Sequence, residues 1–289
     1  MKNIIVTGCS SGIGLAVASV FKKAGYRVFA SARNEKDLMM LTNNGYESFY
    51  LELNSKDSIE KAVKALNAKT SGNISGLVNN AGVSIISAVE DLNIEQMQRQ
   101  FQTNVFGPIY FTNLLLDSLK KERSGHIFFI SSINGRVTFP YMGAYCASKY
   151  ALESFADALR REYLKEGLKV TIVEPGLFKT KSVDNSRKIF DEYEELKKSK
   201  YLYIYKKIYE DFYSKIDKFN DRSVDIIAKT ILAIFKSSKY KKRVIVPFRA
   251  HIFELFVRFC PLMLQDKIIN LRFNYKHIDD DRSKIQENK

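Results

Sequence analysis

One short segment of the chain, YMGAYCASKY, contains three tyrosines and one lysine. A phenol normally loses its proton only near pH ~10, so proton transfer at neutral pH requires a neighbouring group that changes its proton affinity. Tyr145 and Lys149 lie four residues apart in a stretch with helical periodicity, and both fall on one face of a helix predicted to begin near Gly143. An ammonium beside a phenol favours the phenolate. The spacing predicts Tyr145 as a proton donor or acceptor whose pKa Lys149 lowers, whereas Tyr141 and Tyr150 point elsewhere; simple surface packing is the alternative.

A glycine-rich turn follows the first predicted strand. Residues Thr7–Gly14 have the sequence TGCSSGIG. Three glycines let the backbone approach a pyrophosphate, and the free amides at the start of the next helix supply hydrogen-bond donors. The spacing differs from G-x-G-x-x-G and the lysine of a P-loop is missing, so an ordinary turn is the alternative. The position directly after strand one favours nucleotide binding.

Seven β-rich runs alternate with helix-length segments along most of the chain. They are NIIVT, YRVFASA, SFYLEL, ISGLVNNAG, HIFFISS, KVTIVEPG and KRVIVPF. This alternation predicts βαβ crossovers and one doubly wound α/β domain, a Rossmann fold over residues 1–289 with about seven parallel strands and helices on both faces. Residues 178–220 are predicted to form a helical substrate flap, and residues 250–276 an amphipathic helical segment interrupted at Pro261. Residues 277–289 form a charged tail.

Composition narrows the class of protein and its location. The hydrophobic fraction of 45% is ordinary for a globular protein, and three scattered cysteines suit a reducing compartment. Neither a secretory signal nor an apolar run of about 20 residues is evident, so we expect a cytoplasmic protein. The formal charge is +14, mostly carried by the C-terminal third, which could attract an anionic membrane, nucleic acid or an acidic substrate. No recognised nucleic-acid-binding module accompanies it, and we expect no nucleic-acid partner.

The glycine-rich turn also resembles the T-G-x-x-x-G-I-G signature of the short-chain dehydrogenase/reductase family. Further stretches agree with that family in order and distance. They are NNAG at Asn79–Gly82, Asn104 within QTNVFG, Ser132 within ISS, YCASK as Y-x-x-x-K, and PGLFKT at Pro175–Thr180 as P-G-x-x-x-T. The motifs span most of residues 1–180, and their coincidence makes the catalytic interpretation of Tyr145 the favoured one.

The resemblance implies hydride transfer between a nicotinamide and a carbonyl or alcohol. Tyr145 would exchange the proton, Lys149 would lower its pKa and hold the nicotinamide ribose, and Ser132 would hydrogen-bond the substrate oxygen. Asn104 would fix a water that relays protons to Lys149; a polar residue that bends the helix is the alternative. Thr180 would bond the carboxamide, with a helix N-cap as the alternative. No metal site is expected. The implied cofactor contacts are Gly8, Ser10, Ser11, Gly12, Ile13, Gly14, Arg33, Asn80, Ala81, Gly82, Tyr145, Lys149, Pro175, Gly176 and Thr180.

The end of strand two favours one of the two nicotinamide cofactors. A carboxylate there binds the ribose 2′-hydroxyl, whereas a basic residue accommodates a 2′-phosphate. Ala32 stands at the position of the acid and Arg33 follows it. NADP(H) is therefore predicted over NAD(H). The family's usual aspartate near the adenine corresponds to Glu52.

The substrate is expected to be a small hydrophobic molecule. A stripe of apolar and aromatic residues at helical spacing suits an elongated ligand, although such a stripe is more often ordinary core. It consists of Tyr201, Tyr205, Ile208, Phe212, Ile216 and Phe219. The chain is similar to the branch of the family that acts on steroids, retinoids and lipids. We expect an NADP(H)-dependent oxidoreductase for a hydrophobic ketone, aldehyde or alcohol; the alternative is a catalytically silent NADP-binding sensor or scaffold.

The resemblance and the C-terminal sequence also predict partners. A homo-oligomer is usual for the resemblance. Residues 250–273 combine apolar side chains with Arg249, Arg258, Lys267 and Arg272, a mixture that suits peripheral contact with an anionic membrane. The alternative is a helix that packs on the sheet or on a second subunit.

Overall fold

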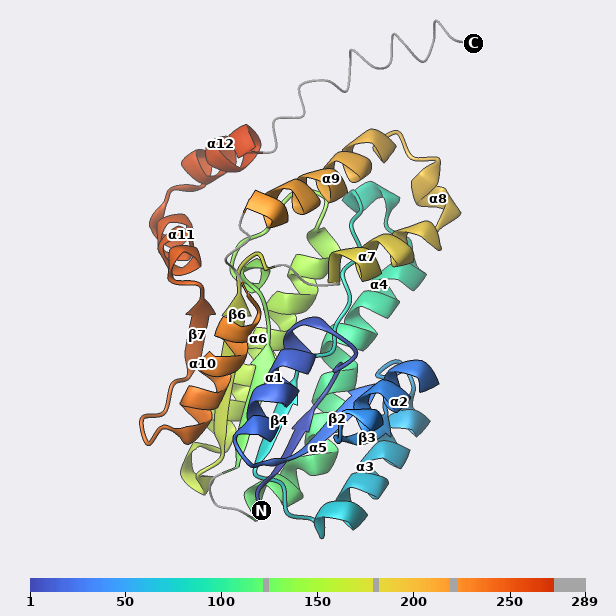
Figure 1. Ribbon diagram of the computed structural model, residues 1–289. Coiled ribbons are helices and arrows are strands. Elements are labelled where there is room, and N and C mark those ends of the chain that lie inside the picture. Colours follow the sequence, from blue (N-terminus) through green and yellow to red (C-terminus); the bar gives the residue numbers. More distant parts are fainter. Residues whose placement is uncertain (122–124, 179–181, 219–222, 273–289) are drawn as a thin grey trace, which may run out of the picture.

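The computed structural model describes residues 1–121, 125–178, 182–218 and 223–272. Its centre is a seven-stranded sheet with the order β3-β2-β1-β4-β5-β6-β7, in which all neighbouring strands are parallel (Figure 1). The strands are β1 (Asn3–Val6), β2 (Arg27–Ala32), β3 (Glu47–Tyr50), β4 (Gly76–Asn79), β5 (His126–Ile130), β6 (Lys169–Pro175) and β7 (Arg243–Val246). The direction of strand order reverses between β1 and β4, and ligands of such sheets bind at this switch point. The predicted doubly wound fold is confirmed.

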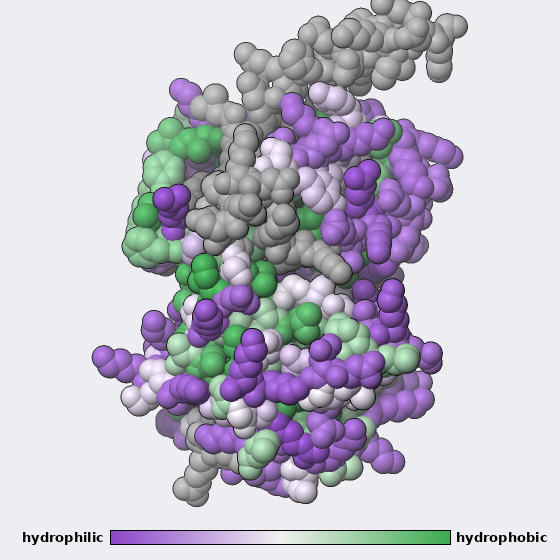
Figure 2. Space-filling view, in the orientation of Figure 1, coloured by the Kyte–Doolittle hydropathy of each residue, from purple (hydrophilic) through white to green (hydrophobic). Residues whose placement is uncertain are grey.

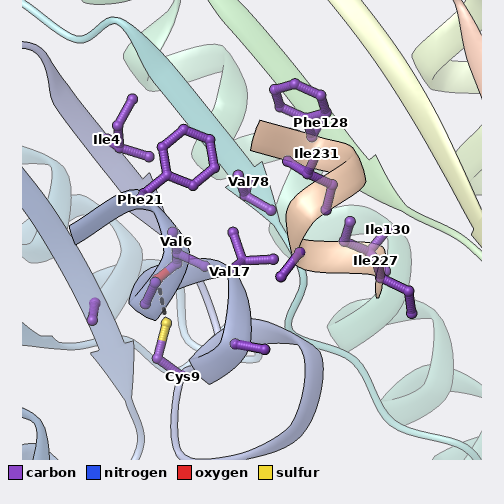
Figure 3. Packing of buried hydrophobic residues seen from close by; sticks show 14 of the residues in the cluster. Ile4, Val6, Cys9, Val17, Phe21, Val78, Phe128, Ile130, Ile227 and Ile231 are labelled. Carbon is purple, nitrogen blue, oxygen red and sulfur yellow. Dashed lines mark hydrogen bonds between the residues drawn. The ribbon is translucent and has the colours of Figure 1, made fainter. Parts of the chain in front are cut away.

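Helices cover both faces of the sheet because successive strand residues point to opposite sides. On β1, Ile4 and Val6 belong to one apolar cluster, which contains side chains of α1 (Gly12–Lys23), α2 (Glu35–Asn43) and α10 (Asp225–Lys236) (Figure 3). Ile5, between them, belongs to the second cluster on the other face. That cluster contains side chains of α3 (Lys56–Thr70), α5 (Gly107–Lys120) and α6 (Gly143–Glu162). The helix predicted to begin near Gly143 begins there.

The described part of residues 178–220 is helical, as predicted. It contains α7 (Ser182–Asp191), α8 (Glu194–Lys197) and α9 (Leu202–Lys218), which lie beyond the carboxyl ends of the strands (Figure 1). These helices share an apolar cluster in which Tyr205 is completely buried. The Tyr205 hydroxyl accepts a hydrogen bond from Ala88 N at 2.9 Å. Tyr205 therefore belongs to the hydrophobic core, which was the alternative interpretation of the aromatic stripe. Phe219, the last residue of that stripe, lies outside the described residues.

Two helices follow the last strand, separated at Pro261 as the sequence suggested. They are α11 (Phe248–Phe259) and α12 (Leu262–Arg272). Many of their apolar side chains face solvent, and Leu262 and Met263 are 73% and 87% exposed. Figure 2 shows this apolar surface at the upper left, over α11 and α12. None of the described helices is both long enough and apolar enough to cross a bilayer. The charged tail 277–289 lies outside the described residues.

Candidate active site

A pocket of about 700 Å³ opens at the carboxyl ends of the strands. It extends from the glycine-rich turn to the face of α6, and the helices of the 178–220 segment contribute to its wall. Most of the predicted site residues line it together. They are Gly8, Ser10, Ser11, Gly12, Ile13, Arg33, Asn80, Ala81, Gly82, Ser132, Tyr145, Lys149, Pro175 and Gly176. Thr180 lies outside the described residues, and Gly14 and Asn104 are not among the lining residues.

The glycine-rich turn has the geometry expected of an anion site. Gly8 and Gly12 have φ of +71° and +59°, values that L residues rarely adopt. Ser11 is the N-cap of α1, but its side chain makes no capping hydrogen bond, and the first turn contains no acidic residue. The amide donors at this helix start are thus available to a negatively charged group in the pocket, as a dinucleotide pyrophosphate requires.

Gly14 supports this turn from behind. A Cβ on Gly14 would lie 2.2 Å from Gly8 O and 2.5 Å from Asn80 Nδ2. Gly14 is not among the residues that line the pocket, because α1 approaches the turn so closely that no side chain would fit at this position; its predicted cofactor contact stays a prediction. Ser31, which the sequence analysis missed, also supports the turn, because its Oγ accepts a hydrogen bond from Gly8 N at 3.0 Å.

The loop after β4 is tied to the end of β1 by side-chain hydrogen bonds. Thr7 Oγ1 accepts hydrogen bonds from the backbone amides of Asn80 and Ala81, both at 3.0 Å. Asn80 Nδ2 donates to the backbone oxygens of Thr7 and Gly8 at 2.9 and 3.1 Å. The NNAG motif thus braces the two loops on either side of the switch point.

Arg33 and Glu52 line the same part of the pocket. Arg33 Nη1 lies 3.8 Å from Glu52 Oε2, and the arginine side chain is 51% exposed. An ion pair this long and this exposed is weak, so the guanidinium remains able to bind a phosphate. The basic residue predicted from strand two is therefore suitably placed at the pocket.

Ser132, Tyr145 and Lys149 meet at the other end of the pocket. Lys149 Nζ donates a hydrogen bond to Ile130 O at 2.9 Å and lies 5.8 Å from the centre of the Tyr145 ring. Burial lowers the pKa of Lys149 to about 8, and the charge of Glu153 opposes this shift. The lysine remains mostly charged at neutral pH.

The pKa of Tyr145 differs from the prediction. Burial raises it to about 12, while a hydrogen bond with Ser132 acts in the opposite direction. The direction of the shift is thus opposite to the lowering predicted from the Lys149 spacing, because burial of the phenol is the largest effect on its pKa. Tyr145 is therefore fully protonated at neutral pH and can act as an acid.

Asn104 lies in a π-helical segment, Gln102–Phe106, between α4 (Ile94–Phe101) and α5. Its Oδ1 accepts a hydrogen bond from Val83 N at 2.8 Å. Its Nδ2 donates to Val83 O at 2.9 Å and to Ser148 Oγ at 3.0 Å. The side chain thus fastens the irregular helix to the loop after β4 and to α6, which supports the alternative kept for it. Such π-helical segments often occur at functional sites.

Asn134 is a lining residue that the sequence analysis missed. Its backbone amide donates to Ser132 Oγ, and Ser132 Oγ donates to Asn134 Oδ1, both at 3.2 Å. The Nδ2 group faces sulfur, 3.4 Å from Cys146 Sγ. The sequence signal for Asn134 was its position two residues after Ser132, because a tight turn there brings Asn134 back into contact with the serine.

The remaining wall suits an apolar ligand. Its apolar side chains come from the loop after β4, from the segment before α6, from the segment after β6, and from α7 and α9. They include Val83, Ile86, Phe139, Met142, Phe178, Val183, Ile208 and Phe212. Among the described side chains of the aromatic stripe, Ile208 and Phe212, one turn apart on α9, reach the pocket. Within the described ranges, no cluster of three or more His, Cys, Asp or Glu side chains could hold a metal ion.

Comparisons with known proteins agree with this geometry. A family model described as short chain dehydrogenase matches residues 2–189. The uncharacterised oxidoreductase YbbO of Escherichia coli strain K12 is 38% identical over 184 residues, covering 64% of this chain and 68% of that protein. The NADPH-dependent 3-dehydrocapnine reductase of Ornithobacterium rhinotracheale is 30% identical over 283 residues, covering 93% and 96%.

The fold also resembles solved structures. A short-chain dehydrogenase from Streptomyces avermitilis matches with a TM-score of 0.70 at 24% identity, over 99% of this chain and 95% of that one. The closed form of a serine dehydrogenase complexed with NADP+ matches with a TM-score of 0.70 at 22% identity, over 85% and 94%. At these identities the likeness concerns the fold.

Proposed function

The chain belongs to the short-chain dehydrogenase/reductase family and is an oxidoreductase, and from this premise we propose that it uses NADP(H) to reduce a hydrophobic ketone or aldehyde. One observation carries the proposal. A single pocket joins the available amides at the start of α1 to the Ser132, Tyr145 and Lys149 side chains. A dinucleotide and a second, apolar molecule would both find their contacts there.

The residues that would hold the cofactor are those of the glycine-rich turn, Arg33, the loop after β4, Lys149, and Pro175 with Gly176. Bound NADPH supplies the hydride. The exposed Arg33 and the absence of an acid at Ala32 favour a 2′-phosphate over a free 2′-hydroxyl. The Ornithobacterium relative, which aligns with nearly the whole chain, is named for its dependence on NADPH.

Three side chains would perform the proton transfer. Tyr145 Oη donates its proton to the substrate oxygen as negative charge develops there, and its raised pKa keeps that proton in place at neutral pH. The Ser132 hydroxyl donates a hydrogen bond to the same oxygen. The Lys149 ammonium stabilises the phenolate that Tyr145 becomes and contacts the nicotinamide ribose. Asn104 contributes by holding α6 and the loop after β4 in register.

The substrate would be steroid-, retinoid- or lipid-like. The apolar wall between Val83 and Phe212 contacts its body, and helices α7–α9 act as the substrate flap of a single domain that spans residues 1–289. The reductase from Ornithobacterium is named for a substrate called 3-dehydrocapnine.

The exposed surface of α11 and α12 would bring the enzyme to such a substrate. Arg249 and Ala250 belong to α11 and also line the pocket, so this surface adjoins the pocket. We propose that it contacts an anionic membrane peripherally, with Arg249 and Lys267 near the headgroups. A second copy of the chain, as in a homo-oligomer, is the other occupant that the same surface suits.

The function is tested by a screen of NADPH oxidation against carbonyl compounds of graded chain length. We expect turnover that increases as the apolar part of the compound grows. The protein should also bind NADPH when no carbonyl is added, as seen by the fluorescence of the cofactor. Tight binding of NADPH without turnover of any carbonyl would instead favour the alternative, a catalytically silent sensor or scaffold.

A further inference from the structure

A group of buried charged side chains lies next to the candidate active site. Three glutamates are almost fully buried: Glu153 of α6, Glu174 of β6 and Glu254 of α11. Arg136 Nε lies 3.3 Å from Glu153 Oε2 and 3.1 Å from Glu174 Oε1. Arg243 of β7 contacts the same two carboxylates. Burial of carboxylates costs free energy that ion pairs only partly offset, so this cluster calls for an explanation beyond stability.

Glu153 contacts both ends of the turn that carries Ser132. Its Oε1 accepts a hydrogen bond from Ser131 Oγ at 2.7 Å. At the other end of the turn, a Cβ on Gly135 would lie 2.2 Å from the same oxygen. Between these points Ser132 and Asn134 are joined by two hydrogen bonds. The Glu153 carboxylate therefore lies against the turn on both sides of Ser132 and supports the position of the Ser132 hydroxyl.

The same carboxylate acts on Lys149. Glu153 follows Lys149 by one helical turn, and its negative charge raises the pKa of the lysine against the lowering effect of burial. Glu174, the other carboxylate of the cluster, directly precedes Pro175, which lines the pocket. One buried cluster thus supports the serine turn, the lysine and the end of β6.

The cluster contains more buried acids than arginines. Glu174 Oε2 is buried and has no hydrogen-bond partner among the described residues. Burial and the charge of Glu174 raise the pKa of Glu153, while the hydrogen bond from Ser131 and the charge of Arg243 oppose this shift. The charged groups that act on Glu153 are Lys149 on α6, Arg136 after β5, Glu174 on β6 and Arg243 on β7. Asp157 of α6 pairs with Arg243, and Glu254 of α11 lies 3.9 Å from both Arg136 and His251.

We propose that Glu153 is a positioning residue for the reaction proposed above, which orients Ser132 through Ser131 and Gly135 and sustains the charge of Lys149. The inference rests on the proposed function. Glu153 does not line the pocket, so it acts on the reaction through these neighbours rather than by contact with substrate or cofactor.

The test compares Glu153→Gln with Asp157→Asn. Glutamine keeps the shape of the side chain and its acceptor for Ser131 but removes the charge. Asp157, one turn further along α6, also pairs with Arg243, at 3.1 Å, but is less buried and does not contact the serine turn. The measurements are kcat and KM between pH 6 and pH 10, the Kd of NADPH, and thermal unfolding.

In Glu153→Gln we expect kcat at pH 8 to fall about 10-fold. The pH at which kcat declines on the alkaline side should also fall by roughly one unit, because Lys149 loses the negative charge that keeps its ammonium protonated. The Kd of NADPH should stay within about twofold, since no cofactor contact changes. Asp157→Asn should keep the parent profile. A folded Glu153→Gln protein with the kcat and the pH profile of the parent would overturn the inference. If Tyr145→Phe loses turnover in the same series of measurements, the proposed function still stands.

A second variant covers the case in which Glu153→Gln does not fold. Ser131→Ala removes the hydrogen bond to Glu153 but leaves every charge in place. We expect kcat to fall about 3- to 10-fold, with the alkaline limb unchanged. Parent activity in Ser131→Ala would contradict the positioning of Ser132 by this cluster.

Discussion

At the scale of single residues, the chemistry depends on which tyrosine can give up a proton. Tyr145 meets Ser132 and Lys149 in the pocket, whereas Tyr141 packs with Tyr201 and Tyr205. Burial raises the pKa of Tyr145, so the phenol holds the proton that reduction would require, and the nearby Lys149, whose pKa burial lowers to about 8, can stabilise the phenolate in its charged form. The two shifts in opposite directions have one cause, the burial of both side chains.

Replacing Tyr145 by phenylalanine removes only the phenolic oxygen. We expect kcat to fall on the order of 100-fold or more, because one acid–base group is lost, while the Kd of NADPH changes little. Tyr150→Phe, on the same helix and 43% exposed, is the matched control and should retain activity. Steady-state kinetics measure kcat, and titration with NADPH measures its Kd. A kcat of Tyr145→Phe close to that of the parent would refute the mechanism.

Arg33 is expected to set the cofactor preference. Arg33→Asp should weaken NADPH binding and reduce or reverse the preference over NADH, because the new carboxylate repels a 2′-phosphate and can bind a 2′-hydroxyl. Lys36→Asp makes the same change of charge at a nearby exposed residue outside the pocket and should leave the preference intact. Both cofactors are titrated into all three proteins. Equal affinity of the unmodified protein for NADPH and NADH would contradict the prediction.

Activity should decrease on the alkaline side of neutrality. The pKa of Lys149 is lowered to about 8, so the ammonium is present below that pH and is lost as the pH rises through it. We expect kcat for carbonyl reduction to be highest near pH 7 and to decline above pH about 8. Measurement of kcat at saturating substrate between pH 6 and pH 10 tests this. A kcat that stays constant up to pH 10 would show that catalysis does not depend on the charge of Lys149.

At the scale of elements, the contact between β1, the glycine-rich turn and α1 decides whether a dinucleotide fits. A Cβ on Gly14 would lie 2.2 Å from a backbone oxygen, and backbone cannot move aside as the end of a side chain can. The π-helical segment around Asn104 has a comparable role on the other side of the pocket, where it fastens α5 and α6 to the loop after β4.

Gly14→Ala is therefore expected to destabilise the protein by about 1–3 kcal/mol through overpacking and to weaken NADPH binding. Gly143→Ala is the control for a helix glycine. Its Cβ would meet only the Val89 side chain at 3.1 Å, and that side chain is 75% exposed and can move. Denaturant unfolding of both variants measures the difference. A Gly14→Ala protein as stable as Gly143→Ala would show that α1 can shift at little cost.

At the scale of the whole molecule, the apolar surface of α11 and α12 distinguishes this chain's C-terminal region from an ordinary solvated face. Large exposed apolar surfaces usually mark contact with a membrane or another protein. This one joins the pocket through Arg249 and Ala250, so a membrane there would present an apolar substrate close to the catalytic groups.

The double variant Leu262→Glu with Met263→Glu tests this surface. The parent protein should float with vesicles of equal parts phosphatidylglycerol and phosphatidylcholine, less so as salt is added, and the variant should not float. Met39→Glu changes an exposed methionine on α2, away from this surface, and should float like the parent. If the parent does not float but the double variant changes its sedimentation from oligomer to monomer, the surface is a contact between copies of the chain.

The sequence by itself determined the fold, and it predicted most of the residues that the pocket brings together. Seven strands and the start of α6 followed from local periodicity, and the Tyr145 and Lys149 spacing placed both side chains on one helix face. These features depend on residues close together in the chain, where side-chain type and spacing suffice. The motif order also identified the family, and the family model confirms it.

Only the tertiary structure decided the electrostatics and the supporting contacts. The pKa of Tyr145 depends on how much water the folded site excludes, which spacing along the chain does not show, so the predicted lowering is opposite in direction to the effect of burial. The bonds of Asn104 to Val83, and those of Glu153 to Ser131, join segments more than 20 residues apart. Spacing along the chain reveals no such pairs, because the approach of distant segments depends on the packing of the entire sheet and its helices.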